Sequence, residues 1–239
     1  LVDLEYDVQL LQVMYGGDTP SLRTPKIHDA LLALDTAGML DHAECRQLIE
    51  ANEFFRNCIN ALRMLRGSAQ DLFLPPVHSQ EHIHCARRMG YEPAAGLSVS
   101  QQLHADFATH TAVIRHFVER HFGRDSLPGN RIATVADLIF AENVSEKIYD
   151  RILTDAGFRN TTRAYRNITA MAKDRETKGR FARLAVLAVD AVKRTPDADM
   201  ALNNWERFVS SLDNPAAHYE QLLSQPMRIE ILLNVFSGS

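Results

Sequence analysis

Apolar residues recur every three or four positions along most of the chain, which is the spacing of one face of an α-helix. The first such stripe consists of Leu4, Val8, Leu11 and Tyr15. It predicts a helix that begins close to the N-terminus and stops at Gly16 and Gly17. A strand would require apolar and polar residues to alternate, and no such alternation persists. The hydrophobic pattern therefore predicts an all-α protein.

Capping residues, glycines and prolines mark the predicted helix ends. Thr24 before Pro25 indicates a helix start, and Asp41 with Glu44 forms a capping box ahead of a long helix that reaches about Arg66. The later predicted helices cover residues 79–90, 99–122, 134–141, 145–156, 160–173, 178–194 and 198–212, and a final pair is punctuated by Pro215 and Pro226. This succession of helices predicts a bundle.

A turn-rich segment, GRDSLPGN at residues 123–130, interrupts the helical pattern. It predicts a boundary between a helical bundle at residues 1–122 and a second, smaller helical subdomain at residues 123–239. A chain of 239 residues with 46% hydrophobic residues can bury a substantial core in such an arrangement.

Composition narrows the environment and the partners of the chain. The formal net charge is −4, so no overall positive field favours nucleic acid, and nucleic-acid binding is an unlikely function. No apolar run reaches the ~18 residues of a membrane span. The three cysteines, Cys45, Cys58 and Cys85, are far apart and lie in helical sequence, which is typical of free thiols in a reducing compartment. We therefore predict a cytoplasmic protein that does not bind membranes.

Histidines near residue 80 raise the question of a metal site. His78, His82 and His84 precede Cys85, and the first two have the i, i+4 spacing that can face one ion. His84 points away from His82 on a helix, and no further ligand follows at a suitable spacing. We therefore interpret them as solvated histidines at a helix start.

A local excess of positive charge lies in the second half of the chain. Residues 159–183 contain Arg159, Arg163, Arg166, Lys173, Arg175, Lys178, Arg180 and Arg183, against Asp174 and Glu176. Arg163 and Arg166 are our candidates for contacts with phosphate or with an acidic partner. The alternative is that the run is simply a solvated helical face.

The N-terminal stretch LVDLEYDVQ contains two carboxylates, Asp3 and Glu5, that are candidate ligands of a divalent cation. If the stretch is extended, both side chains share a face and can bind one ion. If it is helical, they diverge by about 200° and only one of them reaches it. Acidic residues at a helix start also interact favourably with the helix dipole, which is the alternative explanation.

Four short patterns follow one another in the first part of the chain, and a fifth lies at its end. The first pattern, G-G-[LI]-x-[DE]-[ILV]-E-[FY]-x-x-Q without its two glycines, is matched by Asp3, Leu4, Glu5, Tyr6 and Gln9. The next three are P-x-L-R at Pro20, Leu22 and Arg23, A-L-x-x-L-x-x-x-G-x-L at Ala30, Leu31, Leu34, Gly38 and Leu40, and F-[LF]-R at Phe54, Phe55 and Arg56. The fifth lies at the end of the chain and consists of Tyr219, Leu222, Leu223, Pro226, Leu232 and Ser239. The set resembles the region that follows the nucleotidyltransferase core in glutamine-synthetase adenylyltransferases.

This resemblance implies a reaction and its cofactors. Such enzymes transfer AMP from ATP to a tyrosine of glutamine synthetase, or remove it with phosphate, with the help of Mg²⁺. The positions that match Asp3 and Glu5 would complete the catalytic metal site, whose other Asp residues come from a G-S-x-x-D-x-D-like segment. That segment does not occur in this chain, so we expect the chain alone to be inactive and to bind no cofactor by itself.

The resemblance also implies protein partners, namely glutamine synthetase and a PII-type regulator. Two alternatives to an adenylyltransferase remain. One is a related nucleotidyltransferase of the uridylyltransferase type that modifies a signalling protein, and the other is a non-catalytic helical interaction module.

Overall fold

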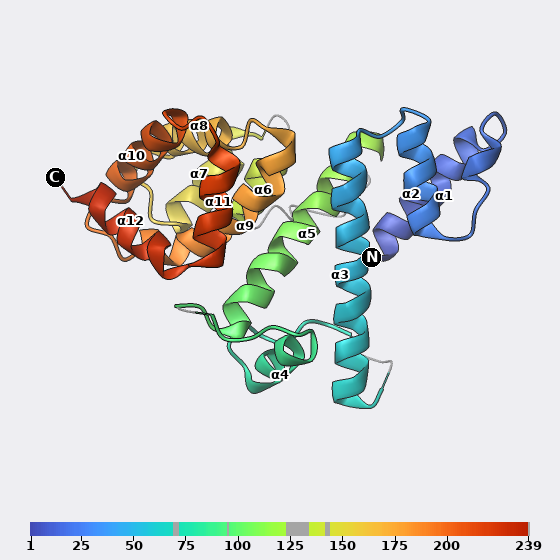
Figure 1. Ribbon diagram of the computed structural model, residues 1–239, viewed down its shortest axis with the longest axis horizontal. Coiled ribbons are helices and arrows are strands. Elements are labelled where there is room, and N and C mark those ends of the chain that lie inside the picture. Colours follow the sequence, from blue (N-terminus) through green and yellow to red (C-terminus); the bar gives the residue numbers. More distant parts are fainter. Residues whose placement is uncertain (69–71, 95, 123–133, 142–143, 239) are drawn as a thin grey trace. The chain divides into compact units, whose positions relative to one another are not determined.

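The computed structural model describes residues 1–68, 72–94, 96–122, 134–141 and 144–238 (Figure 1). Within these ranges every regular element is a helix, apart from an isolated bridge between Ala94 and Leu97. The predicted all-α class is confirmed.

The elements are, in chain order, α1 (Val2–Tyr15), the short 3-10 helix η1 (Pro20–Leu22), α2 (Ile27–Thr36), α3 (His42–Arg66), α4 (Gln80–Arg88), α5 (Val99–Phe122), α6 (Val135–Phe140), α7 (Glu146–Asp155), α8 (Thr161–Met171), α9 (Arg175–Val192), α10 (Ala198–Ser210), α11 (Pro215–Ser224) and α12 (Met227–Ser237).

Side-chain caps explain where several of these helices begin. The Asp41 carboxylate accepts the backbone N–H of Glu44 at 2.9 Å at the start of α3, as the sequence predicts. Helix α9 begins at Arg175, ahead of the predicted start, because the carboxylate of Asp174 accepts two backbone N–H groups of its first turn. The local capping signals therefore set helix starts to within one turn.

The predicted start of the second helix at Pro25 is wrong, because α2 begins at Ile27 after an extended Lys26. The carbonyl oxygen of Thr24 accepts a hydrogen bond from the side chain of Gln12 at 2.7 Å, and this bond holds Thr24 in the connection that follows η1. A contact with another helix thus overrides a local start signal.

The chain forms two compact units, and α5 belongs to both. The first unit comprises Leu1–Leu74 and the part of α5 that begins at His110, whereas Pro75–Thr109 groups with the C-terminal helices in the second unit. The predicted turn segment at residues 123–130 lies outside the described residues. The domain boundary predicted there remains a prediction.

In the first unit, α2 packs against α1, η1 and α3. Its buried residues, Ala30, Leu31 and Leu34, meet a buried stripe on α1. The side-chain amide of Gln12 also donates to the carbonyl oxygen of Leu22 at 2.5 Å, and the guanidinium of Arg23 donates to the carbonyl oxygens of Gly16 and Gly17. These bonds hold the N-terminal helix against the rest of this unit.

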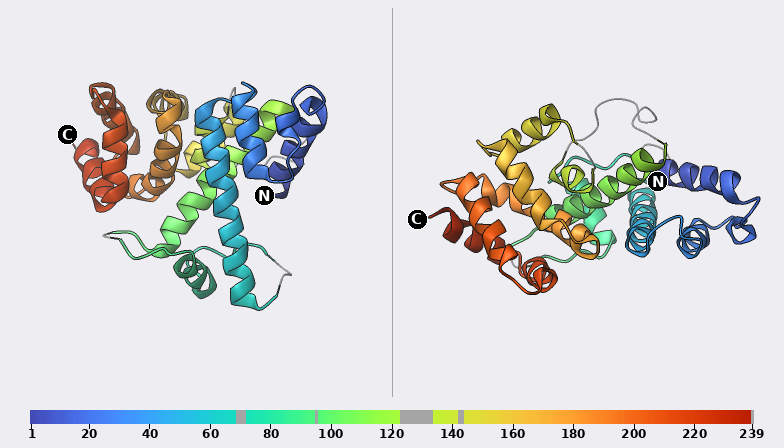
Figure 2. Two further views of the ribbon diagram at one scale, coloured as in Figure 1. Left: turned by 45° about the vertical axis from the view of Figure 1, so that its right-hand side comes forward. Right: turned by 90° about the horizontal axis from the view of Figure 1, so that it is seen from above.

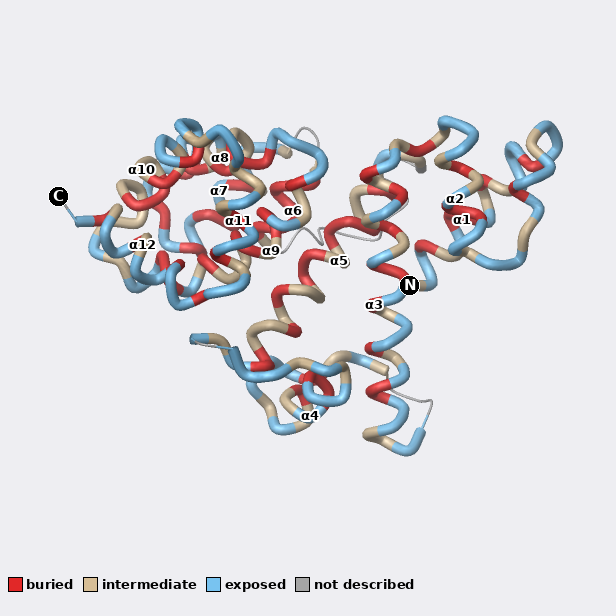
Figure 3. The backbone as a smooth tube through the Cα atoms, in the orientation of Figure 1, coloured by how far each residue is buried: buried red, intermediate tan, exposed pale blue. Residues whose placement is uncertain are grey.

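In the second unit, α9 contacts α6, α11 and α12, and α8 contacts α6, α7 and α10 (Figure 2). All six residues of α6 are buried, as is most of the inner face of α9 (Figure 3). The hydroxyl of buried Tyr219 donates to the carbonyl oxygen of Met171 at 2.9 Å, which ties α11 to the end of α8. This core supports the exposed outer face of α8.

Candidate functional site

The N-terminal acidic residues lie on a helix, since α1 begins at Val2. Two helical positions are about 200° apart around the axis, so Asp3 and Glu5 point in different directions. Asp3 is exposed and Glu5 is half-buried. The helical alternative from the sequence is therefore the one observed, and Asp3 and Glu5 do not form a pair that faces one ion.

Asp7 is the carboxylate that the helix places on the same side as Asp3, one turn further on. Its side chain is only 5% exposed, and its Oδ2 has no hydrogen-bond partner. Burial, and after it the negative charge of Asp3, raises the pKa of Asp7 from 3.8 to about 6.

The sequence reasoning did not single out Asp7, although a signal was present. Asp7 is three positions after Leu4 and four before Leu11, so it occupies a place in the buried stripe that an apolar residue would be expected to fill. A carboxylate at such a position is desolvated when the helix packs.

Metal binding requires several convergent ligands, and the described residues contain no group of three His, Cys, Asp or Glu side chains that could hold an ion. Mg²⁺ is nevertheless often bound by one or two protein carboxylates together with substrate phosphates. The arrangement around Asp3 and Glu5 does not fit a two-carboxylate Mg²⁺ site built by this chain. It leaves Asp3 as a single exposed carboxylate.

Among the histidines near residue 80, the interpretation as solvated side chains is wrong for His82, which is 0% exposed. Its Nδ1 lies 2.9 Å from the hydroxyl oxygen of Ser100, which in turn accepts the backbone N–H of His78 at 3.0 Å. Burial, followed by the proximity of His104 and His78, lowers the pKa of His82. His82 lies on the face of α4 that packs inward, whereas His78 and His84 are exposed as expected.

The basic run divides into side chains that contact the protein and side chains that do not. The Nε of Arg183 lies 2.5 Å from Oδ1 of Asp106, and the ammonium of Lys178 lies 5.5 Å from the centre of the Phe140 ring. These two cations hold α9 to other helices of the second unit.

Four exposed cations instead lie on α8 and beyond its two ends, and we call them the basic stripe: Arg159, Arg163, Arg166 and Lys173. Arg163 and Arg166 lie on α8 itself, about 60° apart around its axis, whereas Arg159 precedes the N-cap and Lys173 follows the C-cap. None of the four forms an ion pair with another described residue. Arg163 and Arg166 are the two members on α8, and the contact with phosphate or an acidic partner that the sequence suggests for them stays a prediction.

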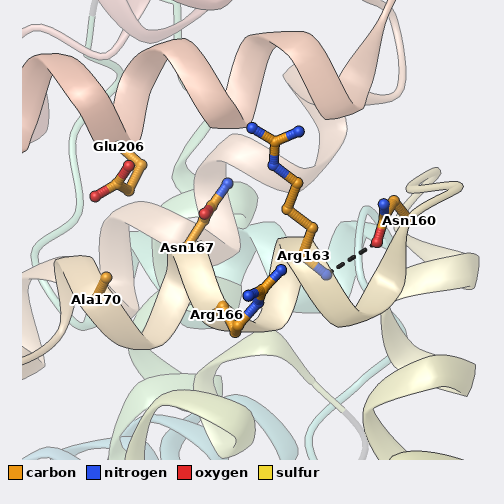
Figure 4. Close-up of a pocket in the computed structure, with 6 residues that line it drawn as sticks. All are labelled: Asn160, Arg163, Arg166, Asn167, Ala170 and Glu206. Atoms are coloured by element: carbon orange, nitrogen blue, oxygen red, sulfur yellow. Dashed lines mark hydrogen bonds between the residues drawn. The ribbon is translucent and has the colours of Figure 1, made fainter.

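Beside the basic stripe, α8 and α10 enclose an open depression of about 600 Å³, which we call the α8–α10 valley. It is lined by Asn160, Arg163, Arg166, Asn167, Ala170 and Glu206. Figure 4 shows the side chains of Arg163 and Asn167 on the side of α8 that faces Glu206. One wall of the valley therefore carries positive charge and the other a carboxylate.

Hydrogen bonds hold the walls of the α8–α10 valley in place. The Asn167 amide donates to Oδ1 of Asn203 at 2.6 Å, which joins α8 to α10. Oε1 of Glu206 accepts the hydroxyl of Ser210 at 2.7 Å. The carboxylate of Asp199, in the first turn of α10, accepts the backbone N–H groups that lead into α8. The valley is a fixed feature of the packing of these two helices.

The described residues therefore define an all-α protein with an exposed carboxylate on its first helix and two exposed arginines, outside any ion pair, on α8. The protein-family model described as GlnD PII-uridylyltransferase matches residues 1–122, about half of the chain. The chain belongs to this family.

Curated relatives extend the similarity over the whole chain. The bifunctional glutamine synthetase adenylyltransferase/adenylyl-removing enzyme of Streptomyces avermitilis is 26% identical over 240 residues, which cover 100% of this chain and 23% of the relative. The protein of the same name from Corynebacterium efficiens is 25% identical over 210 residues, covering 87% of this chain and 20% of the relative.

A third relative with this name, from Xanthomonas oryzae pv. oryzae, is 42% identical over 73 residues, which make up 30% of this chain and 8% of the relative. The chain spans about a fifth to a quarter of the length of the first two relatives. The resemblance to glutamine-synthetase adenylyltransferases is thus confirmed, and no solved structure matches the chain significantly.

No described helix is long and apolar enough to cross a membrane. Cys45, Cys58 and Cys85 are all buried and form no disulfide, whereas the sequence predicts only that they are reduced.

Proposed function

We propose that this chain acts as the helical part of a nucleotidyltransferase that transfers AMP from ATP to a tyrosine of glutamine synthetase, or removes it. In this role its helices support a catalytic domain and bind protein partners. The observation that carries the proposal is the similarity of the whole chain to bifunctional glutamine synthetase adenylyltransferase/adenylyl-removing enzymes. The proposed location is the cytoplasm, which agrees with three free thiols.

A second candidate function is uridylyl transfer to a PII-type signalling protein. The description of the family model that matches residues 1–122 supports it. The two candidates differ in the nucleotide that is transferred and in the protein that receives it. A helical module that only binds partners is the third alternative.

The proposed cofactors of the complete enzyme are ATP and Mg²⁺. A bound Mg²⁺ neutralises charge on the transferred phosphate and aligns the attacking and leaving oxygens. Asp3 is the exposed carboxylate that α1 offers, and Glu5 reaches a different direction. We therefore propose Asp3 as the residue that contacts the metal site, and Glu5 as a second acidic residue that acts from the opposite side of the helix.

The test uses the full-length enzyme that contains this chain, with glutamine synthetase and radiolabelled ATP. Asp3→Asn is expected to reduce AMP transfer by at least about a hundredfold, because a lost charge on a catalytic metal ligand weakens the site strongly. Glu5→Gln is expected to reduce it as well. Asp18→Asn serves as the matched control, since Asp18 is exposed in the turn after α1.

Helical content and thermal melting of the variants are measured alongside, to separate catalysis from folding. If Asp3→Asn and Glu5→Gln both transfer AMP at the wild-type rate, these carboxylates only favour the helix start. If the wild-type protein modifies a PII-type protein with UMP and leaves glutamine synthetase unmodified, the second candidate function replaces the first.

A further inference from the structure

The outer face of α8 and the residues at its two ends carry positive charge that no described residue neutralises. The chain carries a net charge of −4, yet the basic stripe collects four exposed cations on and next to α8, none of them in an ion pair with a described residue. Other cations of the same run contact residues within the protein, as Arg183 does in its ion pair with Asp106. The stripe therefore has no structural partner that accounts for it.

We propose that the basic stripe and the α8–α10 valley bind a segment of another protein that carries acidic side chains along one edge. This inference concerns binding alone and does not depend on nucleotidyl transfer.

The dimensions favour an extended ligand over a small anion. The 11 residues of α8 cover about 16 Å at ~1.5 Å per residue, and Arg159 and Lys173 lie beyond its two ends. A single phosphate or carboxylate engages one or two of these cations, whereas a row of carboxylates on a helix or loop engages all four. The α8–α10 valley also continues into a neighbouring depression of about 340 Å³, because Ala170 lines both, and Lys173 lines the second.

The lining explains how a side chain of the partner would be accommodated. Ala170 contributes only a methyl group at the junction of the two depressions, which leaves room above α8. Asn160 and Asn167 offer amide groups that can donate or accept hydrogen bonds. The guanidinium groups of Arg163 and Arg166 can each donate two parallel hydrogen bonds to a carboxylate, which fixes the orientation of that carboxylate.

Glu206 distinguishes the proposed partner from a nucleic acid. A phosphate backbone is uniformly negative and would bring charge close to the Glu206 carboxylate on the opposite wall. A protein segment can place carboxylates against α8 and a neutral or basic residue against Glu206. The aromatic ring nearest in α8, Tyr165, is stacked on Tyr149 at 4.6 Å between ring centres, so it is not presented to a base.

The experiment measures binding of a fluorescein-labelled, glutamate-rich helical peptide to the intact chain by fluorescence anisotropy, at low and at physiological ionic strength. Binding that weakens as salt is added is expected, because the contacts are exposed charge pairs. The double variant Arg163→Glu/Arg166→Glu is expected to bind the peptide roughly tenfold more weakly or worse, since it places like charges across the contact.

The matched control is Arg56→Glu/Arg180→Glu. It changes the net charge equally at two exposed helical positions that do not line the α8–α10 valley. This control is expected to keep wild-type affinity within about twofold. If the charge-reversed variant melts early, Arg163→Gln/Arg166→Gln removes the same charges without repulsion and is expected to weaken binding in the same direction.

Three results would overturn the inference. In the first, the peptide does not bind the wild-type chain. In the second, it binds the Arg163 and Arg166 variants as tightly as it binds the wild type. In the third case a single-stranded oligonucleotide of similar length binds more tightly than the peptide, which would make this surface a nucleic-acid site. Loss of peptide binding with retained AMP transfer would leave the proposed function standing, and the reverse result would leave this inference standing.

Discussion

Replacing Asp7 with asparagine is expected to stabilise α1 against α2 at neutral and alkaline pH. The Asp7 side chain is 5% exposed and lies in the buried stripe of α1, with Oδ2 unpartnered. Burial raises its pKa from 3.8 to about 6. The ionised carboxylate is therefore disfavoured in the folded chain relative to the unfolded one.

The sign and size follow from this difference in pKa. The folded chain holds the proton more tightly, so stability falls as the pH rises from 3.8 to about 6, and above that range the full penalty is present. At ~1.4 kcal/mol per pKa unit, the penalty is up to about 3 kcal/mol. Asp7→Asn removes the ionisation, so it should recover most of this above about pH 7 and almost none near pH 4.

Amide hydrogen exchange of α1, followed by mass spectrometry of peptides from residues 2–15, measures the effect locally. The only tryptophan, Trp205, lies in α10 and does not report on this helix. At about pH 8 the variant should exchange up to about a hundredfold more slowly than wild type, since each tenfold step equals ~1.4 kcal/mol. Asp18→Asn should exchange as wild type does. Equal protection of Asp7→Asn and wild type at about pH 8 would refute the reasoning.

Two further predictions concern a buried histidine and a helix end. Because burial lowers the pKa of His82, the unfolded chain binds the proton more readily, and α4 should lose amide-exchange protection as the pH falls below 6.5. A His82→Gln variant should lack this pH dependence, and the same dependence in the variant and the wild type would contradict the prediction. Gly67 ends α3 at φ 63°, so Gly67→Ala should lower the free energy of unfolding by about 1 kcal/mol. A Cβ added at Gly17 would meet no atom within 4 Å, so Gly17→Ala should leave the free energy of unfolding unchanged when both variants are compared by chemical denaturation followed by circular dichroism.

Most helices were predictable because their determinants are local. The apolar stripe from Leu4 to Leu11 requires only that neighbouring turns of one helix face the same side, and Asp41 caps α3 through a residue three positions away. The predicted helix start after Thr24 is wrong because the side chain of Gln12, from another helix, donates a hydrogen bond to the carbonyl oxygen of Thr24. Local propensity yields where a distant side chain offers a better hydrogen bond.

The buried polar residues were harder to predict than the helices that carry them. His82 is buried because its helix packs inward and Ser100, from α5, meets its Nδ1. Asp7 stands in an apolar stripe, so its position was visible, but its raised pKa depends on how completely the packed helices bury it. Burial is a property of the packed helices, and periodicity shows only which face is available for it.

The sequence by itself determined that this protein is all-α and which family it resembles, since periodicity, caps and short motifs are written along the chain. It also identified the acidic and basic residues worth testing. Only the tertiary structure decided which of them are available: a helical α1 separates Asp3 from Glu5, Arg183 is paired with Asp106, and Arg163 and Arg166 stay unpaired beside the α8–α10 valley. The reason is that a charge is free or neutralised according to the helices that pack next to it, and those neighbours come from distant parts of the sequence.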